Sequence, residues 1–248
     1  MARILVTGSA DGLGRGTAVE LLDAGHEVVV HARSPERARA LDDLAGRGAA
    51  VLVGDLADTG ETRALAAAAN RLGPMDAVIH NAGVSSKAGP ALPAVNVVAP
   101  YLLTALLERP GRLVYLSSEM HYQGTVDAAH LATVDWTGRD DRIGYGDSKL
   151  MVTALAAAVA RLWPGVPSNS VDPGWVPTRM GGPNATDDLR EGHLTQTWLA
   201  ASDDPQALTT GGYWHRRRRL EPHEAAHDED FQDALLASLE EYTDVPLR

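Results

Sequence analysis

The sequence predicts an α/β fold in a single domain spanning residues 1–248, with helices on both faces of a doubly wound parallel sheet. Short β-branched runs alternate along the chain with Ala- and Leu-rich stretches of helical period, which is typical of repeated βα units. The strand candidates are apolar at nearly every position, as expected for strands buried on both faces. The chain of 248 residues also has the length of one such domain.

The elements follow in order from these local patterns. Strands are expected at Ile4–Val6, Val28–Ala32, Ala50–Val53, Ala77–His80, Leu113–Ser117 and Asn169–Val171. Helices are expected at Leu13–Ala24, Pro35–Gly46, Glu61–Leu72, Ala94–Glu108 and Tyr145–Trp163. An amphipathic helix at Asp230–Tyr242 would close the fold or the substrate pocket, or pack on a partner subunit. Gly25 ends the first helix, and Pro35 opens the second where a missing N–H costs nothing.

Two long connections interrupt the alternation. Glu119–Ile143 is polar, and Trp175–Arg190 is rich in Gly and Pro. Both leave the carboxyl ends of strands, which is where ligands bind in open α/β sheets. We therefore expect them to border the site, with a substrate lid at approximately 175–200.

The composition argues against several classes of function. Lys and Arg number 22 against 33 Asp and Glu, so the net charge of −11 disfavours nucleic acid as a partner. The chain has no Cys, no signal peptide is expected, and no stretch has the length of a membrane span, so we expect a cytoplasmic enzyme. The Arg216–Arg219 run is interpreted as a solvated face or a salt-bridge patch. His223 and His227 lack further ligands, so no metal site is expected.

The segment after the first strand has the composition of a phosphate-binding loop. It runs Thr7-Gly8-Ser9-Ala10-Asp11-Gly12-Leu13-Gly14 and leads directly into a helix. Gly8 would permit a tight turn, Gly12 a close approach to a pyrophosphate, and Gly14 close packing of helix on strand. The helix N-terminus would add amide groups and a positive dipole end. Its place in the first βαβ unit predicts a Rossmann fold that binds a dinucleotide through Gly8, Ser9, Asp11, Gly12, Leu13 and Gly14.

The end of the second strand discriminates between the two nicotinamide cofactors. An acid about 20 residues past the loop would bind the ribose 2′-hydroxyl of NAD. The sequence instead has Arg33 and Ser34 there, and the guanidinium of Arg33 suits a 2′-phosphate. Arg15, in the first helix, is a second basic candidate. We therefore predict NADP(H) as the cofactor.

A pair of side chains further along the chain could handle a proton. Tyr145 and Lys149 are four positions apart and so share one face of a helix. A free Tyr titrates near about 10, and a neighbouring ammonium lowers that value toward the range useful in catalysis. Ser118 follows the strand that ends at Ser117, at the sheet edge where a substrate carbonyl would lie.

Taken in order, these motifs resemble the short-chain dehydrogenase/reductase family over nearly the whole chain. The matching positions are the loop Thr7–Gly14, Asp55-Leu56, Asn81-Ala82-Gly83, Asn96, Ser118, Tyr145 with Lys149, and Pro173–Thr178. The resemblance implies that Asp55 contacts the adenine and that Leu56, Asn81, Ala82, Gly83, Pro173, Gly174, Val176 and Thr178 bind other parts of the cofactor. Val176 and Thr178 would contact the nicotinamide carboxamide.

The resemblance also implies roles for four catalytic residues. Ser118 would hydrogen-bond the substrate oxygen, and Tyr145 would give or take its proton as hydride moves. Lys149 would bind the nicotinamide ribose and depress the pKa of Tyr145. Asn96 would anchor the water through which the proton is replenished. The implied reaction interconverts a ketone or aldehyde and its alcohol.

The spacing before Tyr145 departs from the common family pattern. Ser118 and Tyr145 are 27 positions apart, and this long insertion resembles the branch of retinol dehydrogenases, carbonyl reductases and anthracycline ketoreductases. Candidate substrate-binding residues are Met120, His121, Trp175 and Met180, with Tyr122, His193, Gln196 and Trp198 as further pocket candidates. An aromatic and Met lining predicts a bulky, partly apolar substrate.

Two other functions remain open at this stage. Similar folds also reduce activated carbon–carbon double bonds, and others bind the cofactor as sensors without turnover. The presence of Ser118, Tyr145 and Lys149 together favours catalysis. The oligomeric state stays open, since similar proteins include monomers, dimers and tetramers.

Overall fold

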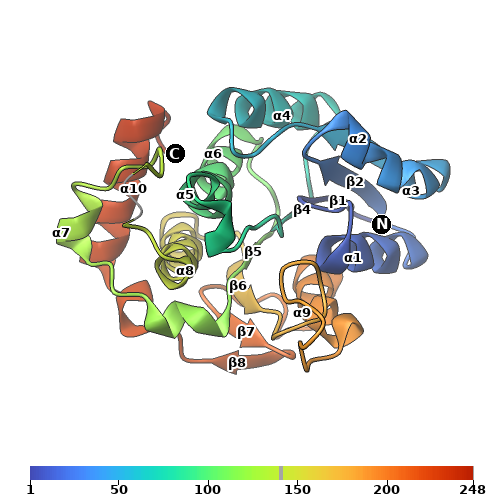
Figure 1. Cartoon of the computed structure of the whole chain (residues 1–248). Coiled ribbons are helices and arrows are strands. Elements are labelled where there is room, and N and C mark those ends of the chain that lie inside the picture. The colour runs from blue at the N-terminus through green and yellow to red at the C-terminus, as the bar shows by residue number, and fades with distance from the viewer. Residues whose placement is uncertain (140–141, 248) are drawn as a thin grey trace.

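An eight-stranded sheet forms the centre of the computed structural model, which describes residues 1–139 and 142–247 (Figure 1). The strands are β1 (Arg3–Val6), β2 (Glu27–Ala32), β3 (Ala50–Val53), β4 (Ala77–His80), β5 (Leu113–Leu116), β6 (Ser168–Asp172), β7 (Tyr213–His215) and β8 (Arg218–Leu220). Their order is β3-β2-β1-β4-β5-β6-β7-β8. Only the last pair, β7 with β8, is antiparallel among these strands.

The chain begins in the middle of this sheet. It proceeds from β1 outward to β2 and β3, and then returns to β4 on the other side of β1. β1 therefore pairs with both β2 and β4, with Ile4 opposite Val28 on one side and Ala77 on the other. The connections that follow β1 and β4 diverge at their carboxyl ends, and this divergence opens the crevice in which such sheets bind ligands.

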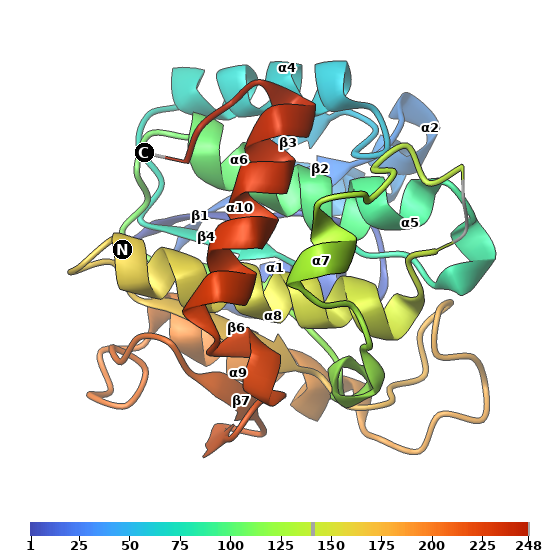
Figure 2. The same cartoon turned by 90° about the vertical axis from the view of Figure 1, so that its left-hand side faces the viewer.

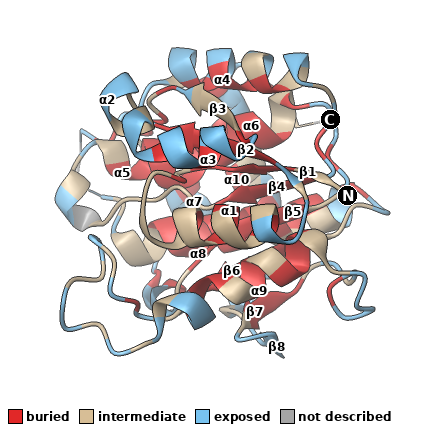
Figure 3. Ribbon diagram, turned by 90° about the vertical axis from the view of Figure 1, so that its right-hand side faces the viewer, coloured by how far each residue is buried: buried red, intermediate tan, exposed pale blue. Residues whose placement is uncertain are grey.

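Helices cover both faces of the sheet (Figures 1 and 2). They are α1 (Gly12–Asp23), α2 (Pro35–Ala38), α3 (Asp42–Gly46), α4 (Thr59–Arg71), α5 (Ala91–Pro93), α6 (Ala99–Leu106), α7 (Ala128–Leu131), α8 (Tyr145–Leu162), α9 (Leu189–Ala201) and α10 (Glu229–Thr243). Alternate strand residues point to opposite faces, so Leu5 packs with α4, α6 and α8, while Ile4 and Val6 pack with α1 and α9. Figure 3 shows these buried inner faces on either side of the sheet.

The structure confirms the predicted α/β architecture and all six predicted strands. The predicted tail helix is α10, and it lies across α8 (Figure 2). The predicted helix Pro35–Gly46 is instead three short turns, with a 3-10 segment at Arg39–Leu41 between α2 and α3. Within the described residues, no helix combines the length and the hydropathy needed to cross a bilayer.

The helix predicted at Ala94–Glu108 is also interrupted. It comprises a π-helical segment at Ala94–Val98 followed by α6, and the short helix α5 comes directly before it. Pro100 lies four residues after Asn96 and has no N–H, so the Asn96 carbonyl cannot receive its usual α-helical hydrogen bond. Such π segments are frequent at functional sites.

The C-terminal third of the chain contains elements that the sequence patterns did not predict. The second half of the expected lid is the helix α9, which packs against α1. The Arg216–Arg219 run forms the turn and most of the second strand of the β7–β8 hairpin. All four residues are exposed and Arg216 pairs with Asp187, which agrees with the predicted solvated face. The long connection after β5 carries a 3-10 segment at Glu119–Gln123 and the helix α7, and its residues 140–141 lie outside the described part.

Candidate active site

A cleft of about 1260 Å³ lies at the carboxyl ends of the parallel strands. The expected site residues that line it are Gly8, Asp11, Gly12, Leu13, Gly14, Arg33, Asp55, Leu56, Asn81, Ala82, Gly83, Ser118, Met120, Tyr145, Lys149, Pro173, Gly174, Trp175, Val176, Thr178 and Met180. The structure places four expected residues elsewhere, namely Ser9, Ser34, Asn96 and His121. Residues that are far apart in sequence thus form one continuous surface.

The glycine loop forms one end of this cleft. Gly8 and Gly12 have φ angles of 66° and 53°, which favour glycine. A Cβ on Gly14 would lie 2.4 Å from the Gly8 carbonyl oxygen and 2.4 Å from Asn81 Nδ2. Asn81 holds the loop in place, because its Nδ2 donates to the Thr7 and Gly8 carbonyls at 2.8 and 3.2 Å. A side chain at Gly14 would therefore collide with the loop itself, and only glycine lets the loop close onto Asn81.

Ser9 supports this loop from below. Its side chain is fully buried, donates to the Val6 carbonyl and accepts from the His31 N–H. The His31 Nδ1 accepts from the Gly8 N–H at 2.9 Å, while its Nε2 lies 2.8 Å from the Gly54 carbonyl oxygen. Burial lowers the pKa of His31, so a neutral ring braces the loop. The Ser9 hydroxyl thus binds backbone groups of the protein and does not face the cofactor as had been expected.

The end of β2 carries two arginines that face the cleft. Arg33 is exposed there, and Arg37 lies beside it as an ion-pair partner of Asp11. The Asp11 carboxylate also lies 3.5 Å from Arg179. Arg37 was not among the cofactor-binding residues expected from the sequence, although it is only four positions after Arg33.

The other two candidates near β2 have different partners. The Ser34 hydroxyl accepts from the Arg37 N–H and caps α2. Arg15 donates to the Ala40 carbonyl and pairs with Asp43 at 2.6 Å. Neither Ser34 nor Arg15 lines the cleft, so Arg33 and Arg37 form its basic end.

Tyr145 and Lys149 open the helix α8 in the middle of the cleft. Lys149 is buried, its Nζ donates to the Leu116 carbonyl at 2.7 Å, and it lies 5.5 Å from the centroid of the Tyr145 ring. The Tyr145 hydroxyl lies 3.8 Å from the sulfur of Met180. Ser118 also lines this part of the cleft. The structure therefore brings together the three side chains expected to surround a reacting carbonyl.

The electrostatics of this group differ from the expectation. Burial raises the pKa of Tyr145 to about 12, opposed by a hydrogen-bonding contact with Ser118 and reinforced by the charge of Asp172. Burial also lowers the pKa of Lys149 to about 8, an effect that Asp172 partly offsets. The pKa of Tyr145 is thus raised where a depression by Lys149 was expected. Lys149 is not among the groups that act on it, and the cost of burying a phenolate is the largest influence.

Asn96 lies behind these residues in the π-helical segment. Its side chain is buried, accepts from the Val84 N–H at 2.8 Å, and donates to the Val84 carbonyl and the Ser148 hydroxyl at 3.0 Å each. The amide thus ties the loop after β4 to α8. The side-chain amide of Asn96 is therefore engaged within the protein. Its backbone carbonyl lacks a helical donor because of Pro100, so that carbonyl is the group available to bind a water.

Apolar side chains surround the open part of the cleft. Met120, Trp175 and Met180 line it and are 41%, 53% and 47% exposed. The sequence did not single out Leu220 on the hairpin, which joins Tyr122 at the same rim with exposures of 42% and 44%. Large exposed apolar side chains gathered around a concave site are typical of binding surfaces.

Other residues expected at this wall are buried in the core. The His121 ring is fully buried, with Nδ1 2.8 Å from the Ser118 carbonyl oxygen and Nε2 accepting from the His223 N–H at 3.0 Å. Both ring nitrogens are engaged, which corrects the expectation that His121 faces substrate. The three remaining pocket candidates, His193, Gln196 and Trp198, are buried on α9.

Three polar residues at the cleft were not identified from the sequence. Asp172 ends β6, and Tyr213 and His215 belong to the neighbouring strand β7. The position of Asp172 directly before Pro173-Gly174 was the available signal. Tyr213 and His215 lay in a segment with no recognised strand pattern.

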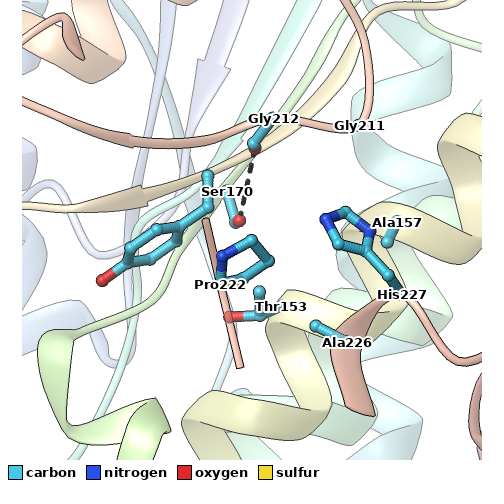
Figure 4. Close-up of a pocket in the computed structure, with 9 residues that line it drawn as sticks. Thr153, Ala157, Ser170, Gly211, Gly212, Pro222, Ala226 and His227 are labelled. Carbon is cyan, nitrogen blue, oxygen red and sulfur yellow. Dashed lines mark hydrogen bonds between the residues drawn. The ribbon is translucent and has the colours of Figure 1, made fainter. Parts of the chain in front are cut away.

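A second cavity, of about 10 Å³, is lined in part by Tyr213. Figure 4 shows other residues that line it. Thr153, Ser170 and His227 line it, and the Ser170 hydroxyl donates to the Gly212 carbonyl at 3.4 Å. This volume accommodates no more than a single water molecule, so substrate binding belongs to the large cleft.

The chain is similar to known proteins over its whole length. The model of the short chain dehydrogenase family matches residues 2–128. Short-chain dehydrogenase chyC of Penicillium rubens is 40% identical over 260 residues, covering 100% of this chain and 99% of the relative. The chain belongs to the short-chain dehydrogenase family. An oxidoreductase role follows from that membership.

More distant members of the short-chain dehydrogenase family are also similar. DnrU of Streptomyces sp., whose name provisionally assigns it as a daunorubicin C-13 ketoreductase, is 32% identical over 87% of this chain and 83% of its own. The crystal structure of a variant of actinorhodin polyketide ketoreductase with NADPH superposes with a TM-score of 0.68 at 24% identity, covering 86% of this chain and 95% of that one. The latter supports the Rossmann fold.

Proposed function

We propose that this protein is an NADP(H)-dependent oxidoreductase that interconverts a ketone or aldehyde and the corresponding alcohol. The observation that carries the proposal is the convergence of Ser118, Tyr145 and Lys149 in the middle of a cleft that has a glycine loop at one end. Bound there, the dinucleotide would supply or accept the hydride. The residues of the chain bind, orient and handle the proton.

The cleft fits such a cofactor along its length. The glycine loop lines the cleft at the N-terminus of α1, whose amide groups and positive dipole end suit a pyrophosphate. The expected cofactor residues from the ends of β3, β4 and β6 line the rest of the surface. Lys149 is placed to hold the nicotinamide ribose, which would require its Nζ to share or leave the Leu116 carbonyl.

The basic end supports NADP(H) over NAD(H). A 2′-phosphate carries more negative charge than a hydroxyl, and Arg33 and Arg37 provide two guanidinium groups for it. Arg37 would exchange its ion pair with Asp11 for the phosphate. An NAD-binding site would place an acid near this position, and the sequence has none at the end of β2.

The proton chemistry follows from the environment of Tyr145. With a pKa raised to about 12, its hydroxyl keeps its proton at neutral pH and can donate it as charge develops on a substrate oxygen. Ser118 would hydrogen-bond the same oxygen. A water on the Asn96 carbonyl would return the proton through the ribose and Lys149. This arrangement suits carbonyl reduction.

The substrate proposed here is bulky and partly apolar. Five of the large exposed apolar side chains lie at the same cleft, namely Met120, Tyr122, Trp175, Met180 and Leu220. A small polar carbonyl compound would leave this rim in water and gain nothing from it. DnrU, whose name refers to reduction of the C-13 ketone of daunorubicin, is in keeping with this substrate class.

Oxidation of NADPH, followed by its absorbance, tests the proposal against bulky ketones, aldehydes and enones. We expect turnover of ketones or aldehydes with NADPH favoured over NADH in kcat/KM. Turnover restricted to enones would identify a double-bond reductase, and firm NADPH binding without any turnover would identify a sensor. Either result would contradict the proposed reaction.

A further inference from the structure

Asp172 is an acidic residue at the reaction centre that the proposed chemistry does not use. It lines the cleft, is 8% exposed, and lies at the end of β6. Its Oδ1 accepts from the Gly174 N–H at 2.9 Å, and its Oδ2 lies 3.4 Å from His215 Nδ1. A carboxylate offers about four acceptor positions, so these contacts fix its orientation without using its full capacity.

Asp172 lies beside the reacting groups, because β6 pairs with β5 and the Ser117 N–H donates to the Val171 carbonyl at 2.7 Å. Burial is the main influence on the pKa values of Tyr145 and Lys149, and the charge of Asp172 acts on both groups as well. A buried carboxylate in this position is costly unless it is paired with a donor. On the side of the hairpin, His215 Nδ1 lies 3.1 Å from the Asp172 backbone carbonyl oxygen and 3.4 Å from the carboxylate, so its N–H is shared between the two.

Tyr213 provides an independent observation at the same wall of the cleft. It is 2% exposed, and its hydroxyl has no hydrogen-bond partner within the described residues. Burial and the adjacent Asp172 carboxylate raise the pKa of Tyr213. The ring is held by His121 and Tyr122, at centroid distances of 4.5 and 6.1 Å. Without the geometry of a full hydrogen bond, Asp172 is still the side chain that acts on this hydroxyl through hydrogen bonding, so Tyr213 and Asp172 form one polar group in this wall.

Glu119 is a further hydrogen-bond acceptor at the cleft. Glu119 lines the cleft from the segment after Ser118 and lies close enough to act on the pKa of Tyr213, after the larger effects of burial and Asp172. The apolar side chains of Met120, Tyr122 and Leu220 surround these groups. The wall therefore combines an apolar rim with hydrogen-bond acceptors below it.

We propose that Asp172, supported by Tyr213, is a specificity-determining residue that binds a hydrogen-bond-donating substituent of the substrate, a hydroxyl or a protonated amine close to the reacting carbonyl. This inference rests on the proposed function. A donor to a fixed carboxylate forms a charge-assisted hydrogen bond. A ketone that lacks the donor would leave the buried carboxylate without that partner, which is how such sites reject analogues.

The test uses matched aryl ketones that carry hydrogen, a hydroxyl or an amino group one, two or three carbons from the carbonyl. We expect the wild-type enzyme with NADPH to favour one donor-bearing series by about tenfold or more in kcat/KM. Asp172→Asn should reduce that preference to within about twofold. The readout is the ratio of kcat/KM between donor-bearing and donor-free ketones, since loss of the Asp172 charge also changes the surroundings of Tyr145 and Lys149. The hydroxyl and amino series show which donor is recognised.

Two further variants control the result. Tyr213→Phe keeps the ring in its place and should reduce the preference by a few fold. Glu119→Gln makes the same carboxylate-to-amide change at an exposed position of the same cleft and should keep the preference. Thermal unfolding of each variant verifies that the fold is retained.

The outcomes separate this inference from the proposed function. No preference in the wild-type enzyme, an equal loss for all ketones in Asp172→Asn, or an equal loss of preference in Glu119→Gln would overturn the role of Asp172 and leave the reaction standing. If no ketone is turned over, the dissociation constants of the same ketones for the NADPH-loaded protein, measured by calorimetry, test the role of Asp172 instead. A donor preference that Asp172→Asn removes would support the inference, and its absence would overturn it.

Discussion

The two halves of the cleft are built in different ways. In the nucleotide half, the loop Thr7–Gly14, Arg33 and Asn81 each follow a parallel strand within a few residues. In the substrate half, contacts join distant segments, such as the Tyr122 hydroxyl to the Glu221 carbonyl and Arg216 to Asp187 at 2.6 Å. The first half uses local geometry repeated by the sheet. The second depends on how loops and a hairpin pack on one another.

The difference has a consequence for function. The hydrogen-bonded sheet holds the backbone groups at strand ends in fixed positions, which suits a cofactor of constant shape. Loops and edge hairpins change without disturbing the core, which suits a substrate that differs between relatives. Variants in the two halves should therefore affect different kinetic constants, and those at their junction should affect the reaction itself.

Tyr145→Phe, at the junction, should have the largest effect. Loss of the proton donor should reduce kcat by about a thousandfold, while the dissociation constant for NADPH stays within about twofold. Single-turnover kinetics and fluorescence titration measure the two quantities. Substantial residual turnover would mean that another group transfers the proton.

Arg33→Ala tests the nucleotide half by itself. It should lower kcat/KM for NADPH by about fiftyfold, because a charge-assisted contact with the 2′-phosphate is lost, and leave NADH within about twofold. Arg15→Ala is the matched control, since that guanidinium is paired with Asp43 away from the cleft. Equal losses for both cofactors would place Arg33 outside the phosphate site.

Lys149→Met tests how much the buried ammonium of Lys149, at the junction of the two halves, reduces the free energy of unfolding. Burial lowers the pKa of Lys149 from 10.5 to about 8, so the folded chain binds fewer protons than the unfolded chain between these values. Stability of the wild-type protein should therefore rise with pH across that window. The variant should be more stable by about 2 kcal/mol at pH 7, after the lost hydrogen bond is counted, and by less at pH 10.

Denaturant unfolding of both proteins at the two pH values measures this difference. Other titrating groups cancel because both chains contain them. A variant that is less stable at pH 7, or a difference that does not change with pH, would show that the ammonium is not strained by burial.

Arg216→Asn tests the substrate half and should have the smallest effect. Asn tolerates the positive φ of this position and removes the ion pair with Asp187, whose Oδ2 accepts from the Trp175 N–H at 2.7 Å. An exposed pair of this kind is worth little, so KM for the ketone should rise about threefold with KM for NADPH unchanged. Arg217→Asn, in the same turn, is the control. Parallel changes in both variants would indicate a general effect on the hairpin.

The nucleotide half was largely predictable because its signals are local. The glycine loop needs only a strand before it and a helix after it, and Tyr145 and Lys149 need only one helical turn between them. The exceptions are informative. Ser9 has the expected position, but its hydroxyl satisfies backbone groups that the bend at Gly8 leaves without partners.

The substrate half was less predictable because its turn lacks the usual signal. The β7–β8 hairpin turns at Arg216 and Arg217, with φ angles of 49° and 57°, where Asn or Gly is the common choice. The strands are only three residues long, so no alternating pattern could reveal them. The helix α9 was hidden for a related reason, since its buried polar residues His193 and Gln196 obscure an apolar stripe.

The sequence by itself therefore determined the first six strands, the dinucleotide loop and the Tyr145–Lys149 pair, since each follows from periodicity or spacing within a few turns of chain. Tertiary structure alone decided the sign of the pKa shift at Tyr145, the burial of His121 and the place of Asp172 beside the reaction centre. Burial and electrostatic fields depend on which distant segments meet, and spacing along the chain carries no record of that.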